Sequence, residues 1–64
     1  MKTKEIIKLI EDDGWYEVRQ KGSHKQYKHP VKRGLVTIPV HRLSSDLSPG
    51  LKKSILKQAQ IEKN

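Results

Sequence analysis

A histidine that directly follows a Gly-Ser pair, His24, is the residue of this chain best suited to chemistry. Histidine exchanges a proton near neutral pH, and the preceding Ser23 can donate a hydrogen bond to a phosphate. Segment 18–42 around them contains no Asp or Glu, and its Lys and Arg residues are Arg19, Lys21, Lys25, Lys28, Lys32, Arg33 and Arg42. Such a concentration of cations attracts a polyanion. The combination predicts a site that binds a nucleic acid and cuts it.

Cleavage of RNA needs a base that removes the proton of a ribose 2′-hydroxyl, and cations that stabilise the negative charge of the transition state. We predict that His24 is this general acid/base. The alternative for His24 is a solvated turn residue without a role in catalysis. The predicted RNA-binding residues are the neighbouring cations and the serine: Arg19, Lys21, Ser23, Lys25 and Lys28.

The sequence leaves open which group protonates the leaving 5′-oxygen: His29, His41 or a lysine. His29 precedes Pro30 and is expected to shape a loop, whereas His41 follows a predicted strand that could neighbour the strand of His24. We expect no metal site, because the spacing of the three histidines and Asp46 matches no recognised ligand pattern and the chain has no cysteine. The expected reaction needs neither a metal nor a cofactor.

The composition bounds the size of the fold and the kind of partner. The chain has 64 residues, of which 33% are hydrophobic, and a net charge of +7. We therefore expect one small domain, residues 1–64, with a thin core and a polyanionic partner. No apolar run is long enough to span a membrane, so we expect a cytoplasmic protein. Trp15 and Tyr16 could both stack on bases, but beside a thin core at least one of them is expected to be structural.

Apolar residues at helical spacing predict one helix near each end of the chain. The first helix covers residues 4–13, with Thr3 as its N-cap and Gly14 after its end. The second begins after the N-cap Ser48, with Pro49 at its first position. The apolar stripes that these helices would bury are Ile6, Ile7, Leu9 and Ile10 in the first, and Leu51, Ile55, Leu56 and Ala59 in the second.

Three strands are predicted between the helices, at residues 15–20, 23–28 and 35–38. A turn at Lys21-Gly22 joins the first two, and a basic loop at residues 30–34 follows the second. Because side chains alternate along a strand, Tyr27 on the core face would place His24 on the opposite face, toward solvent or a ligand.

The predicted order of elements is α-β-β-β-α. In such an α+β fold a three-stranded antiparallel sheet buries one face under two helices and leaves the other face open. This is the arrangement of the double-stranded-RNA-binding domain.

Several motifs follow one another along nearly the whole chain: Gly14-Trp15, Arg-x-x-Gly-Ser-His from Arg19 to His24, Tyr27, His29-Pro30, Pro39-Val40-His41, and Ile55 to Ala59 after Pro49-Gly50. In these motifs and their order the chain resembles the HicA family, the small toxins of HicA–HicB toxin–antitoxin systems. It departs from the family at Lys25, which stands where many members carry a second histidine.

The resemblance implies the same double-stranded-RNA-binding-like fold and a ribonuclease, an mRNA interferase that arrests growth. The catalytic histidine of the family corresponds to His24. The resemblance also implies a HicB-type antitoxin that covers this histidine, and contact with DNA only through the toxin–antitoxin complex. The alternative to an endoribonuclease is a non-catalytic RNA-binding module that uses the same basic surface and fold.

Overall fold

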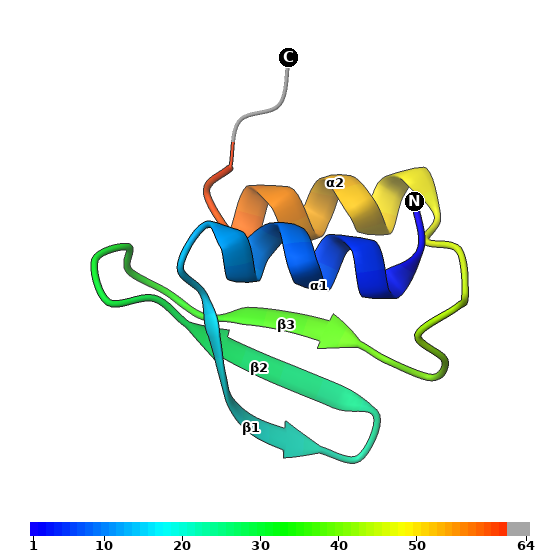
Figure 1. Ribbon diagram of the computed structural model, residues 1–64, viewed down its shortest axis with the longest axis horizontal. Helices are drawn as coiled ribbons and strands as arrows, with labels where there is room; N and C mark the ends of the chain where they lie inside the picture. The colour runs from blue at the N-terminus through cyan, green and yellow to red at the C-terminus, as the bar shows by residue number, and fades with distance from the viewer. Residues whose placement is uncertain (62–64) are drawn as a thin grey trace.

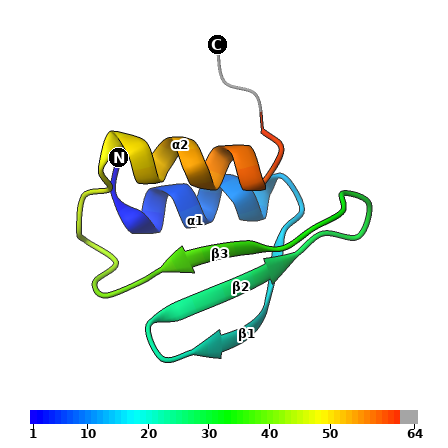
Figure 2. The same cartoon turned by 180° about the vertical axis from the view of Figure 1, so that it is seen from behind.

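The structure is a computed structural model and describes residues 1–61. The elements follow the order α1 (Thr3–Asp12), β1 (Tyr16–Lys21), β2 (His24–Lys28), β3 (Val36–Pro39) and α2 (Pro49–Gln58). The strands form an antiparallel sheet in the order β1-β2-β3. Both helices lie on one face of the sheet (Figure 1), and the view from behind shows the same two layers (Figure 2). The predicted α+β fold is confirmed. Among residues 1–61, no helix has the length and apolar character that a membrane span requires.

The core lies between the helix pair and one face of the sheet. The two apolar stripes predicted for the helices contribute to it, and Ser48 caps α2 as expected, because its Oγ accepts a hydrogen bond from the Leu51 N–H at 3.2 Å. Tyr27 is only 1% exposed, so the predicted inward direction of this side chain is confirmed. The buried hydrophobic residues are Ile6, Ile10, Trp15, Tyr27, Val36, Ile38, Ile55, Leu56 and Ala59.

The start of α1 differs from the prediction. Lys2, not Thr3, is the N-cap, and Thr3 is a buried helical residue whose Oγ1 donates to the Ser45 carbonyl at 3.2 Å. The first free N–H groups of the helix, at Thr3 and Lys4, donate to the carbonyls of Ser45 and Leu43 at 2.9 and 3.0 Å. The loop after β3 therefore satisfies the helix end that a capping side chain would otherwise serve.

The first turn of α1 also holds Glu5. Its carboxylate accepts a hydrogen bond from the Lys2 backbone N–H at 2.6 Å, and this bond lowers the pKa of the Glu5 carboxyl.

A two-residue turn, Gly22-Ser23, joins β1 to β2. Gly22 has a φ of +59° and no other residue of the turn has a positive φ, as in a type II′ turn. The turn pairs Lys21 with His24, and Pro39 of β3 lies on the other side of His24. The Val40 N–H donates to the Ser23 carbonyl at 2.6 Å. Backbone hydrogen bonding between the two neighbouring segments therefore continues one residue beyond Pro39 of β3.

At the other end of the sheet, His29 fastens the loop after β2 to the end of α1. Its Nδ1 accepts hydrogen bonds from the N–H groups of Val31 and Lys32, at 3.0 and 2.9 Å. Since Nδ1 is an acceptor, the ring proton is on Nε2, which donates to the Asp13 carbonyl at 2.7 Å. The ring also meets Trp15 edge-on, with centroids 5.2 Å apart, and the side chain is only 9% exposed. His29 is therefore a structural histidine.

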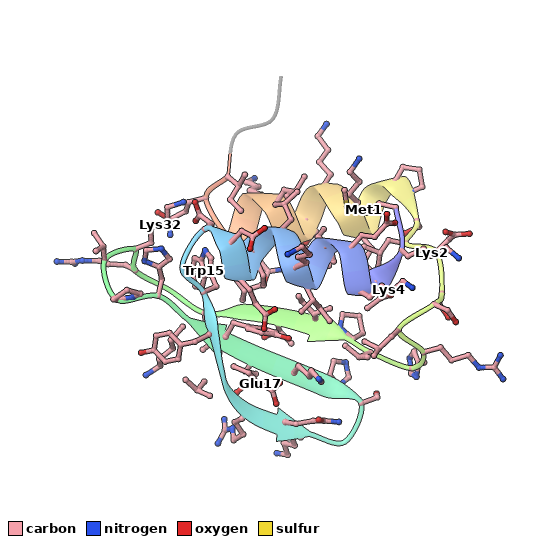
Figure 3. All side chains as sticks on the ribbon, viewed as in Figure 1. Met1, Lys2, Lys4, Trp15, Glu17 and Lys32 are labelled. Carbon is pink, nitrogen blue, oxygen red and sulfur yellow. The ribbon has the colours of Figure 1, made fainter. Side chains whose placement is uncertain are left out.

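Lys32 joins three segments at the same end. Its Nζ donates to Asp13 Oδ2 at 2.6 Å and to the carbonyls of Ala59 and Gln60 at 3.3 and 3.0 Å. Figure 3 shows Lys32 beside Trp15, where α1 runs into β1. The predicted basic loop thus uses one of its cations inside the fold. The contact also explains an acidic residue at the C-terminal end of α1, which the helix dipole disfavours.

We expect His29→Ala to destabilise the protein by roughly 2–4 kcal/mol, because it removes three hydrogen bonds and leaves two backbone N–H groups without their acceptor. The free energy of unfolding in urea measures the effect. His41→Ala is the matched control, since His41 is exposed, and is expected to change stability by no more than about 0.5 kcal/mol. Equal stability of the two variants would contradict the structural role of His29.

The titration of the buried Tyr27 hydroxyl is expected to limit the stability of the protein at alkaline pH. Burial, with a smaller effect of the carboxylates of Glu17 and Glu11, raises the pKa of Tyr27 to about 12. The unfolded chain loses this proton near the ordinary tyrosine pKa of about 10, so the folded state binds more protons between the two values. The stabilisation by the neutral phenol is complete below about pH 10 and is lost as the pH rises toward about 12.

Thermal unfolding between pH 9 and pH 12 should therefore show a steeper loss of Tm for the parent protein than for Tyr27→Phe. The phenylalanine keeps the ring in the core and removes the titrating hydroxyl, while the deprotonation of lysines affects both proteins alike. Parallel curves for the two proteins would show that Tyr27 does not limit stability at high pH.

Candidate nucleic-acid interface

His24 is the first residue of β2 and its side chain is exposed. Tyr27, three residues later, is buried on the helix side, so the alternation of the strand directs His24 to the face that the helices leave uncovered. We call this side of the sheet the open face. Among residues 1–61, no hydrogen bond or ion pair engages the His24 ring. Both ring nitrogens are therefore available to a ligand.

The register brings predicted RNA-binding residues to the same face. Residues directly opposite each other on neighbouring strands project to the same side of a sheet. Lys21 is opposite His24, and Arg19 is opposite Gln26, which follows His24 by two residues. Lys28 comes next on the same face of β2. The open face thus combines His24 with three of the predicted cations, Arg19, Lys21 and Lys28.

Gln26 orients the guanidinium of Arg19. The Nε and Nη2 groups of Arg19 both donate to Gln26 Oε1, at 3.2 and 3.0 Å. These bonds use two of the five N–H donors of the guanidinium and leave the others for a ligand. Gln26 is not among the predicted site residues. With the turn at Gly22-Ser23, instead of the predicted Lys21-Gly22, counting back along the hairpin gives its pairing with Arg19.

A β-bulge shapes the open face beside Arg19. The register shifts between Glu17 and Arg19, so that Val18 is the extra residue of β1. Val18 and Arg19 line the same shallow depression, which has a volume of about 380 Å³. The remaining lining residues are Gln26, Lys28 and Leu35. The depression therefore has both an apolar part and a cationic part.

Of the other two predicted RNA-binding residues, only Ser23 remains close to His24. Lys25 alternates with His24 and shares the side of Tyr27, where its Nζ lies 3.4 Å from Glu17 Oε1. Ser23 stays beside His24 in the turn and is half-buried, and its carbonyl accepts the Val40 N–H. The structure does not bring Lys25 to the face that carries His24.

The other two histidines, His29 and His41, lie at different ends of the sheet. His29 lies at the end of β2 distant from His24, and its ring nitrogens bind backbone groups. His41 is exposed and follows Pro39, the neighbour of His24 in the sheet, by two residues. The loop that carries His41 lies at the same end of the sheet as the β1–β2 turn (Figure 1). Of the two histidines, only His41 is near the end of the sheet that holds His24.

The structure also distinguishes the neighbouring aromatics. Trp15 is buried, and its Nε1 donates to the Ala59 carbonyl at 3.2 Å, so it ties β1 to the end of α2. Tyr16 is opposite Lys28 in the register and therefore belongs to the open face, where half of it is exposed. Trp15 is the structural residue of the pair, and Tyr16 is accessible to a ligand.

The candidate metal ligands do not converge. Within the described part of the chain, residues 1–61, no three side chains of the His, Cys, Asp or Glu type come together as a set that could hold a metal ion. His24, His29 and His41 therefore do not form a three-histidine site within these residues.

Comparison with known proteins identifies the family. The model of the HicA toxin of bacterial toxin–antitoxin systems matches residues 3–61. This match spans both helices and all three strands of the described structure. No curated protein matches the chain significantly. The chain belongs to the HicA family and is the toxin of a bacterial toxin–antitoxin system.

Proposed function

We propose that this toxin is an endoribonuclease that cleaves mRNA, with His24 as its general acid/base. The observation that carries the proposal is the position of His24, an exposed ring without a protein hydrogen-bond partner among residues 1–61, on a face shared with three cations. The ring nitrogens of a structural histidine are already hydrogen-bonded within the protein, as those of His29 are. A histidine that exchanges protons with a substrate must instead present its nitrogens to that substrate.

The proposed reaction uses the 2′-hydroxyl of the substrate as the nucleophile. His24 removes the proton of this hydroxyl, and the 2′-oxygen forms a bond to the adjacent phosphorus. The bond from phosphorus to the 5′-oxygen breaks, and this oxygen takes a proton. The products are a 2′,3′-cyclic phosphate and a free 5′-hydroxyl. His41 or a lysine of the open face supplies the second proton transfer.

Arg19 and Lys21 are suited to the charge that develops on the phosphate. Arg19 presents a guanidinium whose orientation is set by Gln26, so less freedom is lost when a phosphate binds. Lys21 is directly opposite His24 and supplies a mobile cation beside the reacting group. Lys28 lies farther along β2 and would bind a neighbouring phosphate.

The second candidate is an RNA-binding module without catalytic activity. The same cations and the same fold favour it, since both functions need a basic open face. The two candidates differ in what His24 does, because a binding module needs only the charge of the face.

We expect His24→Ala to lose RNA cleavage by a factor of about 10²–10⁴, the usual contribution of a general acid/base, and to lose growth arrest. Its Tm should stay close to that of the parent protein, because the ring makes no hydrogen bond within residues 1–61. Lys53→Ala, an exposed position on α2, is the matched control and should cleave normally. A folded His24→Ala variant that still cleaves would exclude His24 as the general acid/base, and a parent protein that binds RNA without cleaving it would favour the binding module. A variant that unfolds would make His24 structural.

The use of the 2′-hydroxyl gives an independent test. A substrate with a 2′-O-methyl group at the cleaved nucleotide should bind but resist cleavage, and cleavage of the unmodified RNA should continue in EDTA. Mass spectrometry should find a 2′,3′-cyclic phosphate and a 5′-hydroxyl on the products. Products with a 5′-phosphate, or activity that a divalent metal restores after chelation, would show that water and a metal perform the reaction.

Membership of the family implies an antitoxin partner. We infer that this partner is a HicB-type protein whose acidic surface covers the open face, and that DNA is contacted only through the complex. Complementary charge would speed association and shield His24. The rate of association should fall as salt rises, and His24 should resist diethyl pyrocarbonate in the complex. Equal modification of His24 in the free and bound toxin would place the antitoxin elsewhere.

A further inference from the structure

The open face carries apolar side chains as well as cations. Tyr16 is 50% exposed, Val18 44% and Leu35 38%, and we call these three residues the apolar strip. Val18 and Leu35 line the depression together with Arg19 and Lys28. Tyr16 is opposite Lys28, so the strip continues to the end of the strand pair. The proposed chemistry at His24 does not use these residues.

The strip borders cations and contains no carboxylate. The nearest acid in β1, Glu17, projects to the helix side and pairs with Lys25 at 3.4 Å. The fitting ligand therefore has flat apolar surfaces joined by a negatively charged backbone. An unpaired stretch of RNA has this composition, since its bases expose their faces and each linkage carries a phosphate.

Stacking of a base on the Tyr16 ring requires that the base be unpaired. An aromatic ring can stack on a base only where the face of that base is uncovered, and in a duplex the neighbouring base pairs cover both faces. The tyrosine side chain offers a large ring with few rotatable bonds, so ordering it on a base costs little entropy. Lys28, directly opposite, can neutralise the phosphate of the same nucleotide.

The strip lies within reach of RNA that is bound at His24. Lys28, the partner of Tyr16, follows His24 by four residues, which is about 13 Å along the strand. At the 3.4 Å spacing of a stacked strand this distance corresponds to no more than about four nucleotides. A strand that places one linkage at His24 would therefore carry a nearby base to Tyr16.

We propose that the open face is a platform for single-stranded RNA on which Tyr16 stacks with an unpaired base near the cleaved linkage. Arg19 and Lys28 bind the phosphates between this base and the cleaved linkage. Val18 and Leu35 supply the apolar lining of the depression under the RNA. The proposal rests on the proposed ribonuclease function and names its substrate class as unpaired RNA. The toxin would thus use the sheet, and single strands, although its fold resembles that of a double-stranded-RNA-binding domain.

Binding is measured in the His24→Ala background, so that cleavage does not interfere. The probe is a fluorescein-labelled RNA of mixed sequence without self-complementarity, used alone and annealed to its complement. Fluorescence anisotropy should show tighter binding of the single strand than of the duplex. The additional change Tyr16→Ala should weaken binding of the single strand by about 5- to 100-fold, the loss expected for one base stack.

Two further variants separate stacking from other effects. Tyr16→Phe keeps the ring and should bind like the background protein. Val31→Ala removes an apolar side chain that is 84% exposed but lies outside the open face, and it should also bind normally. The Tm of each variant shows whether it folds.

Abasic RNA locates the contact. When the base that meets Tyr16 is removed, Tyr16→Ala should no longer weaken binding, because the stack is already absent. A scan of abasic positions on both sides of the cleaved linkage should find one such position.

Tighter binding of the duplex, or equal single-strand affinity of the Tyr16→Ala and Val31→Ala variants, would overturn the platform while cleavage by His24 could still stand. If Tyr16→Ala weakens only the complex with the antitoxin, the strip serves the protein partner and the proposal is wrong. The cleavage assay of His24→Ala is a separate test of the proposed catalytic role, and it does not depend on the result for Tyr16. A parent protein that neither binds nor cleaves RNA would exclude both.

Discussion

The burial of Tyr27 is the constraint on which the functional surface depends. The chain has few large apolar residues, and this ring joins the core between the sheet and the two helices. Because side chains alternate along β2, an inward Tyr27 requires His24, Gln26 and Lys28 to project outward. A shift of one residue would bury His24 and expose the tyrosine. The packing of the core therefore also positions the residue that we propose for catalysis.

A network of polar contacts stabilises the end of the sheet that lies far from His24. His29 and Lys32 bind backbone groups of three segments, and Asp13 accepts from both. Such bonds stabilise a fold whose small core limits the contribution of apolar burial. The basic segment 18–42 thus serves two purposes. Lys25 and Lys32 form ion pairs within the fold, whereas Arg19, Lys21 and Lys28 lie on the open face with His24.

The same surface suits both of the proposed partners. RNA and an acidic antitoxin would each be attracted by the cations of the open face, and each could cover the apolar strip. Occupation by one would exclude the other, so neutralisation would need no change of shape in the toxin. The bulge at Val18 contributes to this surface, because it brings Val18 and Arg19 to the same depression.

Local patterns in the sequence determined the order of the elements, the Ser48 cap, the stripes of the helices and the outward direction of His24. These features depend on residues close together in the chain, where period, capping and turn chemistry act. Tertiary structure decided which polar residues would be structural. The loop that replaces a Thr3 cap, the contacts of Lys32 and His29, and the exposure of Tyr16 beside a buried Trp15 all join segments distant in sequence. The packing of the helices against the sheet determines which distant segments come into contact, and local sequence patterns carry no information about that packing.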